Sequence, residues 1–372
     1  MGLKAGIVGL PNVGKSTLFN AITNLHVEAA NYPFATINPN TGVVNVPDER
    51  LTCLTNIFKP LRKIPASVEF IDIAGLVKGA SHGEGLGNQF LAQIRECDAV
   101  VEVVRCFVDP DIFHIEDSID PIRDIEIINL ELVMADLNTV LKRIEKNEAK
   151  ARIAKDKEAI YEMAILNPLK TTLEQGFPAR KAKLSEEQIA YSKNNYHLLT
   201  SKPIIYVANV GEEDLLDLNS SEMYQQVVNY AIKDNSKVIP VSARVESDLS
   251  SLNEKEKQEY LKELNVDESG LEKVIKATYC LLDLSTFFTV GSDECRAWTF
   301  KNGMSAPECA GIVHTDFQKG FICAEVYPYE AIKELGSENA VREAGKIRTE
   351  GKNYYPKDGD IMFFRFNVNK RV

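Results

Sequence analysis

A loop near the start of the chain contains the residues with the clearest chemistry. Four of them match the spacing G-x-x-x-x-G-K-[ST]: Gly9, Gly14, Lys15 and Ser16. Glycines let successive backbone N–H groups surround a phosphate chain, the lysine adds a mobile positive charge, and the serine hydroxyl can bind Mg²⁺. An apolar run precedes the loop and a helical pattern follows it, so we predict a site for a nucleoside triphosphate.

We expect consecutive residues of the loop to surround the phosphates. The residues that we expect to contact the nucleotide here are Asn12, Val13, Gly14, Lys15, Ser16 and Thr17. We also assign Lys15 a catalytic role, because its charge can stabilise the phosphoryl group during transfer. A chance glycine-rich turn is the alternative, but it would not explain four matched positions between a strand and a helix.

Three oxygen-bearing residues are candidate Mg²⁺ ligands: Ser16, Thr36 and Asp72. Thr36 lies in a turn-rich loop, where its hydroxyl would complete the metal shell only while a γ-phosphate is bound; Thr41 is the alternative. Asp72 ends an apolar strand, and Gly75 can bring its N–H to the γ-phosphate without a side chain intervening. The structural alternatives are an ordinary surface loop at Thr36 and a turn cap at Asp72.

The residues after Gly75 bear on the rate of hydrolysis. Leu76 stands where many GTPases place a glutamine that orients the attacking water, so the water must be positioned differently. The stretch 79–87 is rich in glycine and predicts a switch that changes shape with the nucleotide. His114, in a loop after the strand at 98–106, is a catalytic candidate, although a solvated loop histidine is the simpler interpretation.

The base is predicted to meet a second group of residues. Asn209, Val210 and Glu212 occupy the place of N-K-x-D in GTPases, with valine replacing lysine and glutamate replacing aspartate. Guanine needs the aspartate to accept from its N1–H and 2-amino group, whereas an asparagine amide can pair with N6 and N7 of adenine. The sequence therefore favours ATP or relaxed specificity. Ser242 and Ala243 resemble the short loop that contacts the base edge.

Composition limits the class of protein. The chain has 372 residues, a net charge of −11 and seven cysteines, which are scattered and form no C-x-x-C pair. An acidic chain is not expected to coat nucleic acid, and scattered thiols favour a reducing compartment. With no leader-like start and no apolar run of 18 residues, we expect a soluble cytoplasmic protein without a membrane partner.

The elements that must position these residues alternate between strand and helix over residues 1–128 and 200–284, which predicts a nucleotide-binding domain. Between them, residues 129–199 read as two long helices and hence as an antiparallel coiled-coil arm. Its apolar stripe comprises Leu130, Val133, Leu137, Val140, Leu141 and Ile144. We expect the first helix to break at Asn167–Pro168 and the second to begin at Ser185.

The arm is basic and the final segment is different in character. Residues 142–183 hold 11 Lys and Arg against 6 Asp and Glu, which suits a nucleic-acid contact or, alternatively, a solvated face with ion pairs. Residues 285–372 change to short strands and turns, which predicts a compact α+β binding domain.

The chain resembles the Obg-like ATPase family of the YchF type over its whole length. The residues that carry the resemblance are GLPNVGKST from Gly9, NYPFATINPN around Thr36, DIAGLVKGASHGEGLGNQF from Asp72, and NVGE at Asn209. The resemblance implies an α/β, Ras-like P-loop domain with an inserted coiled-coil arm and a C-terminal TGS domain of β-grasp type. It also implies ATP preferred over GTP, slow Mg²⁺-dependent hydrolysis, and association with ribosomes.

Single residues and partners follow from the same resemblance. Leu76 matches the family's apolar replacement of the catalytic glutamine, and His114 matches a loop histidine proposed as its substitute. Asn12 matches a residue of potassium-activated relatives, so K⁺ is a second candidate cofactor beside Mg²⁺. The implied partners are ATP, the ribosome (50S or 70S) and rRNA. We expect the protein to be a monomer that contacts the ribosome and rRNA through the arm and the TGS domain.

Three functions remain open from the sequence. The first is an ATPase that regulates translation or a stress response through slow hydrolysis. The second is a nucleotide-gated binding protein whose output is ribosome or RNA occupancy, with hydrolysis as a reset, which Leu76 favours. The third is a GTPase.

Overall fold

A computed structural model describes residues 3–24, 40–75, 86–112, 118–264 and 266–367. The chain forms two compact units, which we describe separately. Unit 1 comprises Met1–Leu25, Ile37–Gly42 and Glu69–Val274, and unit 2 comprises His26–Thr36, Val43–Val68 and Ile275–Val372. The described helices include none that is long and apolar enough to cross a membrane.

Unit 1 is built on a sheet with the strand order β2-β4-β1-β5-β6-β7. The strands are β1 (Lys4–Val8), β2 (Thr41–Asn45), β4 (Ser67–Asp72), β5 (Ala99–Cys106), β6 (Ile204–Val210) and β7 (Lys237–Val241). The pairs that β1 makes with β4 and β5, and β6 with β5 and β7, are parallel. Every residue of β5 and β6 is buried, as expected for central parallel strands covered on both faces.

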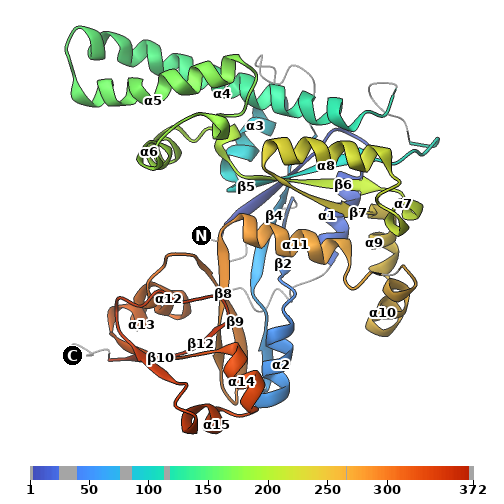
Figure 1. Cartoon of the computed structure of the whole chain (residues 1–372), viewed down its shortest axis with the longest axis vertical. Helices are drawn as coiled ribbons and strands as arrows, with labels where there is room; N and C mark the ends of the chain where they lie inside the picture. The colour runs from blue at the N-terminus through green and yellow to red at the C-terminus, as the bar shows by residue number, and fades with distance from the viewer. Residues whose placement is uncertain (1–2, 25–39, 76–85, 113–117, 265, 368–372) are drawn as a thin grey trace. The chain divides into compact units, whose positions relative to one another are not determined.

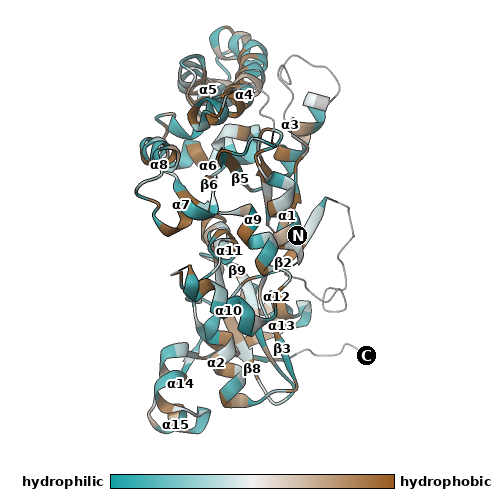
Figure 2. Cartoon of the chain, turned by 90° about the vertical axis from the view of Figure 1, so that its right-hand side faces the viewer, coloured by the Kyte–Doolittle hydropathy of each residue, from teal (hydrophilic) through white to brown (hydrophobic). Residues whose placement is uncertain are grey.

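Helices cover this sheet and extend from it (Figure 1). They are α1 (Lys15–Asn24), α3 (Leu86–Glu96), α4 (Pro121–Arg152), α5 (Lys157–Glu174), α6 (Glu186–Tyr196), α7 (Glu212–Leu216), α8 (Glu222–Asp234), α9 (Ala243–Leu249), α10 (Glu254–Glu263) and α11 (Gly270–Leu281). Two 3₁₀ turns lie at Ala179–Lys181 and Leu199–Ser201. Helix α10 is hydrophilic over most of its length (Figure 2).

The arm is a helical hairpin, but its helices differ from the predicted pair. Helices α4 and α5 run side by side (Figure 1) and share a core to which α4 contributes Val133 and Val140. The predicted stripe was wrong at Leu130 and Leu141, which are 57% and 37% exposed. Leu137 and Ile144 pack against the core, so the stripe follows spacings of four, three and four residues.

The predicted break at Asn167–Pro168 was also wrong, because α5 continues through Pro168. The chain turns earlier, at residues 153–156, where Asp156 caps the start of α5. A proline inside a helix costs about 3 kcal/mol. Burial outweighs that cost, since each buried leucine or isoleucine contributes about 1.5–3 kcal/mol and α5 buries Ile165, Leu166, Leu169 and Leu173.

The predicted start of α6 was correct in detail. Ser185 accepts a hydrogen bond from the backbone N–H of Gln188, and the Gln188 side chain accepts one from the backbone N–H of Ser185. This reciprocal pair satisfies two backbone donors that a helix start would otherwise leave unbonded.

Unit 2 is built on a second sheet, with the order β11-β10-β12-β8-β9-β3. Its strands are β3 (Arg62–Ile64), β8 (Leu284–Val290), β9 (Glu294–Lys301), β10 (Phe321–Pro328), β11 (Arg348–Glu350) and β12 (Asp360–Phe366). Its helices are α2 (Glu49–Phe58), α12 (Ala306–Val313), α13 (Thr315–Lys319), α14 (Tyr329–Leu335) and α15 (Glu338–Glu343). The core beneath the sheet is aromatic, with Phe287 in contact with Phe300 and Phe364.

Unit 2 includes a segment that the sequence placed elsewhere. Residues Val43–Val68, which contain α2 and β3, group with the C-terminal residues, and β3 pairs with β9 as a parallel edge strand. Arg50 of α2 donates to Asp358 at 2.7 Å and lies over the Phe288 ring. The predicted division had assigned all of residues 1–128 to the nucleotide domain, so it differs here; the boundaries at 129, 200 and 285 remain predictions.

Candidate nucleotide-binding site

The predicted phosphate loop lies between the end of β1 and the first residue of α1. Asn12 and Gly14 adopt positive φ angles of 63° and 93°, which curl the backbone between them. The N–H of Leu18 donates to the Gly14 carbonyl at 2.9 Å and closes the first helical turn. The N-terminus of α1, with Lys15 and Ser16 as its first residues, thus opens directly onto the curled loop.

Lys15 and Asp72 form an ion pair between their side chains. The pair follows from the sheet, because β1 and β4 are parallel neighbours and Ile7 lies in register with Asp72. The carboxyl ends of both strands therefore meet at one edge, where α/β folds place their ligands. The two side chains are only 10% and 21% exposed, so the charges lie in a partly desolvated place.

Gly75 lies against the phosphate loop. A Cβ atom built at Gly75 would lie 3.6 Å from Cγ of Pro11, which is ordinary van der Waals contact. The neighbouring N–H of Ala74 donates to the Gln93 side chain of α3 at 3.3 Å. The segment after Asp72 is thus held beside the loop, where the sequence predicted it.

Asn209 bonds to both of the loops that it lies between. Its Nδ2 donates to the Val13 carbonyl at 2.8 Å, and its Oδ1 accepts from the N–H of Ala243 at 3.0 Å. The residue is 5% exposed. A Cβ atom at Gly14 would lie 2.2 Å from Nδ2, so glycine is required there for the amide to approach.

These two bonds change the interpretation of Asn209. The amide retains one Nδ2 hydrogen and one Oδ1 lone pair after serving Val13 and Ala243. The bidentate pair with adenine that we considered from the sequence would have to use that remaining hydrogen and lone pair. The two observed bonds make Asn209 a brace between the phosphate loop and the base-edge loop.

The neighbouring predicted residues differ in exposure. Val210 is 2% exposed, in the all-buried strand β6, whereas Glu212 is exposed at the start of α7. The hydroxyl of Tyr260, on α10, donates to Glu212 Oε1 at 3.3 Å. Of the N-x-x-E residues beyond Asn209, only the glutamate thus presents a polar side chain to solvent, and Tyr260 was not anticipated.

A buried arginine was also missed by the sequence analysis. Arg105, the penultimate residue of β5, is 1% exposed, and its guanidinium donates to the carbonyls of Phe107, Asp109 and Ile112 at 3.1–3.3 Å. It thereby organises the start of the loop that continues to His114. The available signal was a charged residue inside a strand that is mostly apolar.

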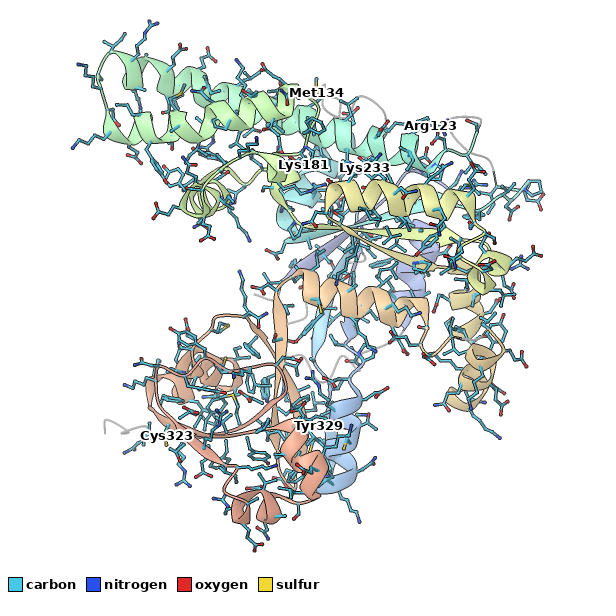
Figure 3. The ribbon with its side chains drawn as sticks, viewed as in Figure 1. Arg123, Met134, Lys181, Lys233, Cys323 and Tyr329 are labelled. Carbon is cyan, nitrogen blue, oxygen red and sulfur yellow. The ribbon has the colours of Figure 1, made fainter. Side chains whose placement is uncertain are left out.

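A buried acidic network lies on another part of the sheet. Glu102 and Tyr206 are in register on β5 and β6, and the tyrosine hydroxyl donates to Asp234 at 3.2 Å. Asp234 also pairs with Arg180 and Lys181, the latter marked in Figure 3. Although burial opposes it, these two cations hold the pKa of Asp234 below its ordinary value.

For Glu102, the charge of Arg180 does not offset the effect of burial. It is 1% exposed, and neither carboxylate oxygen has a hydrogen-bond partner among the described residues. Burial raises the pKa of Glu102 well above its ordinary value. The network therefore contains one carboxylate that stays charged and one that favours the protonated form.

Several predicted residues lie outside the described part of the chain: Thr36, Leu76, His114 and the switch glycines before Gly87. Thr41, the alternative to Thr36, is the first residue of β2, and Gly87 lies in the first turn of α3. The described residues contain no cluster of three or more His, Cys, Asp or Glu suited to a metal. Ser16 and Asp72 nevertheless offer the hydroxyl and carboxylate oxygens that Mg²⁺ takes beside nucleotide phosphates.

Comparisons with known proteins find relatives along the whole chain. A family model described as a 50S ribosome-binding GTPase matches residues 4–143, and a model named YchF-GTPase_C, described as a protein of unknown function, matches residues 284–367. The chain is 54% identical to the ribosome-binding ATPase YchF of Bacillus subtilis, over 99% of this chain and 100% of that protein. It is 47% identical to human Obg-like ATPase 1, over 98% and 93% of the two chains.

A solved structure extends the likeness to the fold. The structure described as the YchF GTPase of Schizosaccharomyces pombe aligns with a TM-score of 0.88 at 40% identity, covering 98% of both chains. The predicted fold class, a P-loop α/β domain followed by a separate C-terminal domain, is therefore confirmed.

Proposed function

The chain belongs to the YchF type of the Obg-like ATPase family, and we propose that it is a Mg²⁺-dependent ATPase that binds ribosomes in a nucleotide-dependent manner. That it is a nucleoside-triphosphate hydrolase follows from its membership of this family and from the phosphate-loop domain. The proposal adds slow turnover, a preference for ATP over GTP, and regulation of translation or of a stress response as the output.

One observation carries the chemical part of this proposal. Lys15 and Asp72, 57 residues apart, meet beside a loop whose curl depends on Gly14. Ser16 and Thr36 would supply hydroxyl ligands to Mg²⁺, and Asp72 would support the metal shell. When bound, the ion neutralises charge on the phosphates. Lys15 then holds the β- and γ-phosphates, and the N–H of Gly75 contacts the γ-phosphate.

The base is held at the opposite end of the site. Ser242 and Ala243 contact its edge, Val210 packs behind it and Glu212 lies beside it. Asn209 fixes the loop that carries Ala243, and its remaining N–H faces the base. The replacement of aspartate by Glu212 supports adenine, as does the word ATPase in the names of the relatives.

Slow turnover is supported by Leu76, whose side chain cannot orient a water. Two groups are proposed to compensate for it: His114 as a general base, and K⁺ bound near Asn12. Replacement of His114 by alanine should lower turnover and leave ATP affinity intact. Equal activity in sodium and potassium salts would remove the ion from the account.

Two observations support binding to the ribosome: the names of the relatives and the positive charge of the arm. Lys142, Lys146 and Lys150 lie one turn apart on α4, all are exposed, and none forms an ion pair with any residue that the structure describes. Unpaired lysines in a row suit a phosphate backbone, so we assign them to rRNA. The C-terminal domain is proposed as a second contact, the whole protein acting as a monomer in the cytoplasm.

Ribosome co-sedimentation of the full chain tests this function. Binding should differ between ATP, a non-hydrolysable analogue and ADP. Reversing the three α4 lysines to glutamate should abolish nucleotide-dependent sedimentation, whereas reversing Lys233, Lys237 and Lys262, which are also exposed, should not. Equal sedimentation of the two triple variants would contradict the role of the arm.

The same assay examines a second function, a nucleotide-gated binding protein in which hydrolysis only resets the state. Leu76 favours this alternative. If the analogue and ATP gave the same cellular output, turnover would not be the function.

A further inference from the structure

The base-edge loop at Ser242–Ala243 is held from two sides. On one side, Ala243 donates its N–H to Asn209, as described above. On the other side, the N–H of Glu246 donates to the Ser242 carbonyl at 2.9 Å and closes the first turn of α9. Glu246 is therefore only one helical turn from the loop, and a displacement of Glu246 would also displace Ser242.

The side chain of Glu246 is anchored to the start of α11. It is 5% exposed, and its Oε1 accepts from the N–H of Gly270 at 2.6 Å. Burial raises the pKa of Glu246, while the nearby N–H of Leu271 and hydroxyl of Ser269, itself 2% exposed, oppose that shift. The buried carboxylate thus bonds to one of the free N–H groups of the helix start.

The contact between α11 and the end of β7 is close. A Cβ atom at Gly270 would lie 3.1 Å from Glu246 Oε1, 3.1 Å from Cγ2 of Val241 and 3.2 Å from the carbonyl oxygen of Pro240. Only a residue without a side chain fits there without displacement. The start of α11 is therefore packed directly against the strand and helix that flank the base-edge loop.

We propose that Glu246 is a positioning residue for nucleotide binding, which fixes the base-edge loop against the first turn of α11. It does not touch the nucleotide. Its hydrogen bonds and those of Asn209 form a linked series from the Val13 carbonyl, through Ala243 and Glu246, to Gly270.

This proposal rests on the proposed role of Ser242 and Ala243 at the base. Comparing a ligand that has a base with one that lacks it distinguishes a failure of the Glu246 proposal from a failure of that proposed role. The full chain is titrated with MgATP and with inorganic tripolyphosphate, which lacks a base. If the wild type bound both equally, the proposed base contacts would be wrong. If it prefers ATP, the variants report on Glu246.

The variant Glu246→Gln keeps the shape but turns an amide NH₂ toward a backbone donor. We expect it to weaken ATP binding about tenfold, the effect of one hydrogen bond to a charged group, with tripolyphosphate binding changed less than about twofold. Unchanged ATP affinity, or equal losses for both ligands, would overturn the proposal.

A matched control lies elsewhere in unit 1. Asp136 is also a buried carboxylate, 2% exposed, that accepts two backbone N–H groups and one hydroxyl, those of Leu199 and Thr200. Asp136→Asn should lower the melting temperature as Glu246→Gln does, but leave the affinity for ATP intact. A loss of ATP affinity in Asp136→Asn equal to that in Glu246→Gln would show that the effect is general destabilisation.

A second measurement decides the case if Glu246→Gln fails to fold. Amide hydrogen exchange of Gly270 and Leu271 in the wild type should slow when MgATP is added, because the loop and the start of α11 are ordered together. Gly270→Ala should weaken ATP binding, whereas Gly351→Ala, with open space around it, should not. Exchange rates that do not respond to ATP would contradict the proposal.

Discussion

The two ends of the proposed nucleotide site are built by different means. The phosphate end consists of the consecutive residues of the phosphate loop, whose charged and hydroxyl side chains would contact the ligand. An ion pair joins Lys15 of this loop to Asp72 at the end of β4. The base end depends on backbone groups. The Asn209 side chain accepts a hydrogen bond from the N–H of Ala243, 34 residues away, and donates one to the carbonyl of Val13, 196 residues away. Side-chain chemistry defines one end, and a network of buried hydrogen bonds shapes the other.

This difference explains why the two ends should respond differently to substitution. Loss of a charge at the phosphate end removes an interaction with the ligand itself. Loss of a bond at the base end leaves buried backbone groups unsatisfied and displaces a loop, so binding and stability fall together. The following predictions test that distinction in order of decreasing effect.

Lys15→Ala should produce the largest effect. We expect a loss of at least about a hundredfold in ATP turnover, since removal of one transition-state contact commonly costs this much. The melting temperature should change little, because the lysine is not part of a core. A steady-state phosphate-release assay measures the rate. Lys4→Ala, which removes another partly exposed ion-paired lysine, is the control and should retain the wild-type rate.

Gly14→Ala should affect both ends together. The new methyl group would collide with Asn209 Nδ2 and would also oppose the positive φ of 93°. We expect ATP affinity to fall by more than about tenfold and the melting temperature to drop, as for other strained substitutions. Gly176→Ala has a similar φ of 80° with no atom within 4 Å, and should leave ATP binding intact. Similar losses in both variants would mean that backbone strain, not the collision, is responsible.

Asn209→Ala should show the response of the base end alone. Removing the amide leaves the Val13 carbonyl and the Ala243 N–H unpaired, so we expect about a tenfold loss of ATP affinity with a lower melting temperature. Calorimetric titration and thermal unfolding measure the two effects. Asn302→Ala removes an amide that links Ser285 and Asp283 in unit 2, and should change stability only. Wild-type ATP affinity in Asn209→Ala would contradict the role of Asn209 as a brace.

The smallest effect is expected at Glu102, which lies outside both ends. Its raised pKa means that the folded protein holds this proton more tightly than the unfolded chain. Its contribution to stability is thus complete below the ordinary glutamate pKa and declines as the pH rises toward the folded value. Glu102→Gln should therefore melt at a higher temperature than the wild type at neutral pH, by an amount that shrinks toward pH 4, with ATP turnover unchanged. A constant difference across that range would contradict the assignment.

The parts that the sequence predicted share a physical basis. The phosphate loop, β1 and α1 were predictable because their residues act locally, through chain curvature and helix capping. The same holds for Ser185 at the start of α6. Positions that depend on distant partners were not predictable, since no local pattern distinguishes Asn209 as a brace from Asn209 as a base reader.

The errors have a similar cause. Pro168 is a local helix breaker, yet packing of α5 on α4 outweighs it. Helix α2 and strand β3 lie in the sequence between two strands of the nucleotide sheet, but β3 pairs with β9, more than 200 residues later. Arg105 and Glu246 are charged residues whose burial depends on tertiary contacts. In each case a long-range interaction overrides what neighbouring residues favour.

Side-by-side titration of the full chain with MgATP and MgGTP tests the central claim most directly. The claim is that the N-x-x-E residues and the braced base-edge loop form an adenine site on a phosphate loop shared with GTPases. The account predicts a lower dissociation constant for ATP than for GTP. Equal or tighter binding of GTP would contradict it.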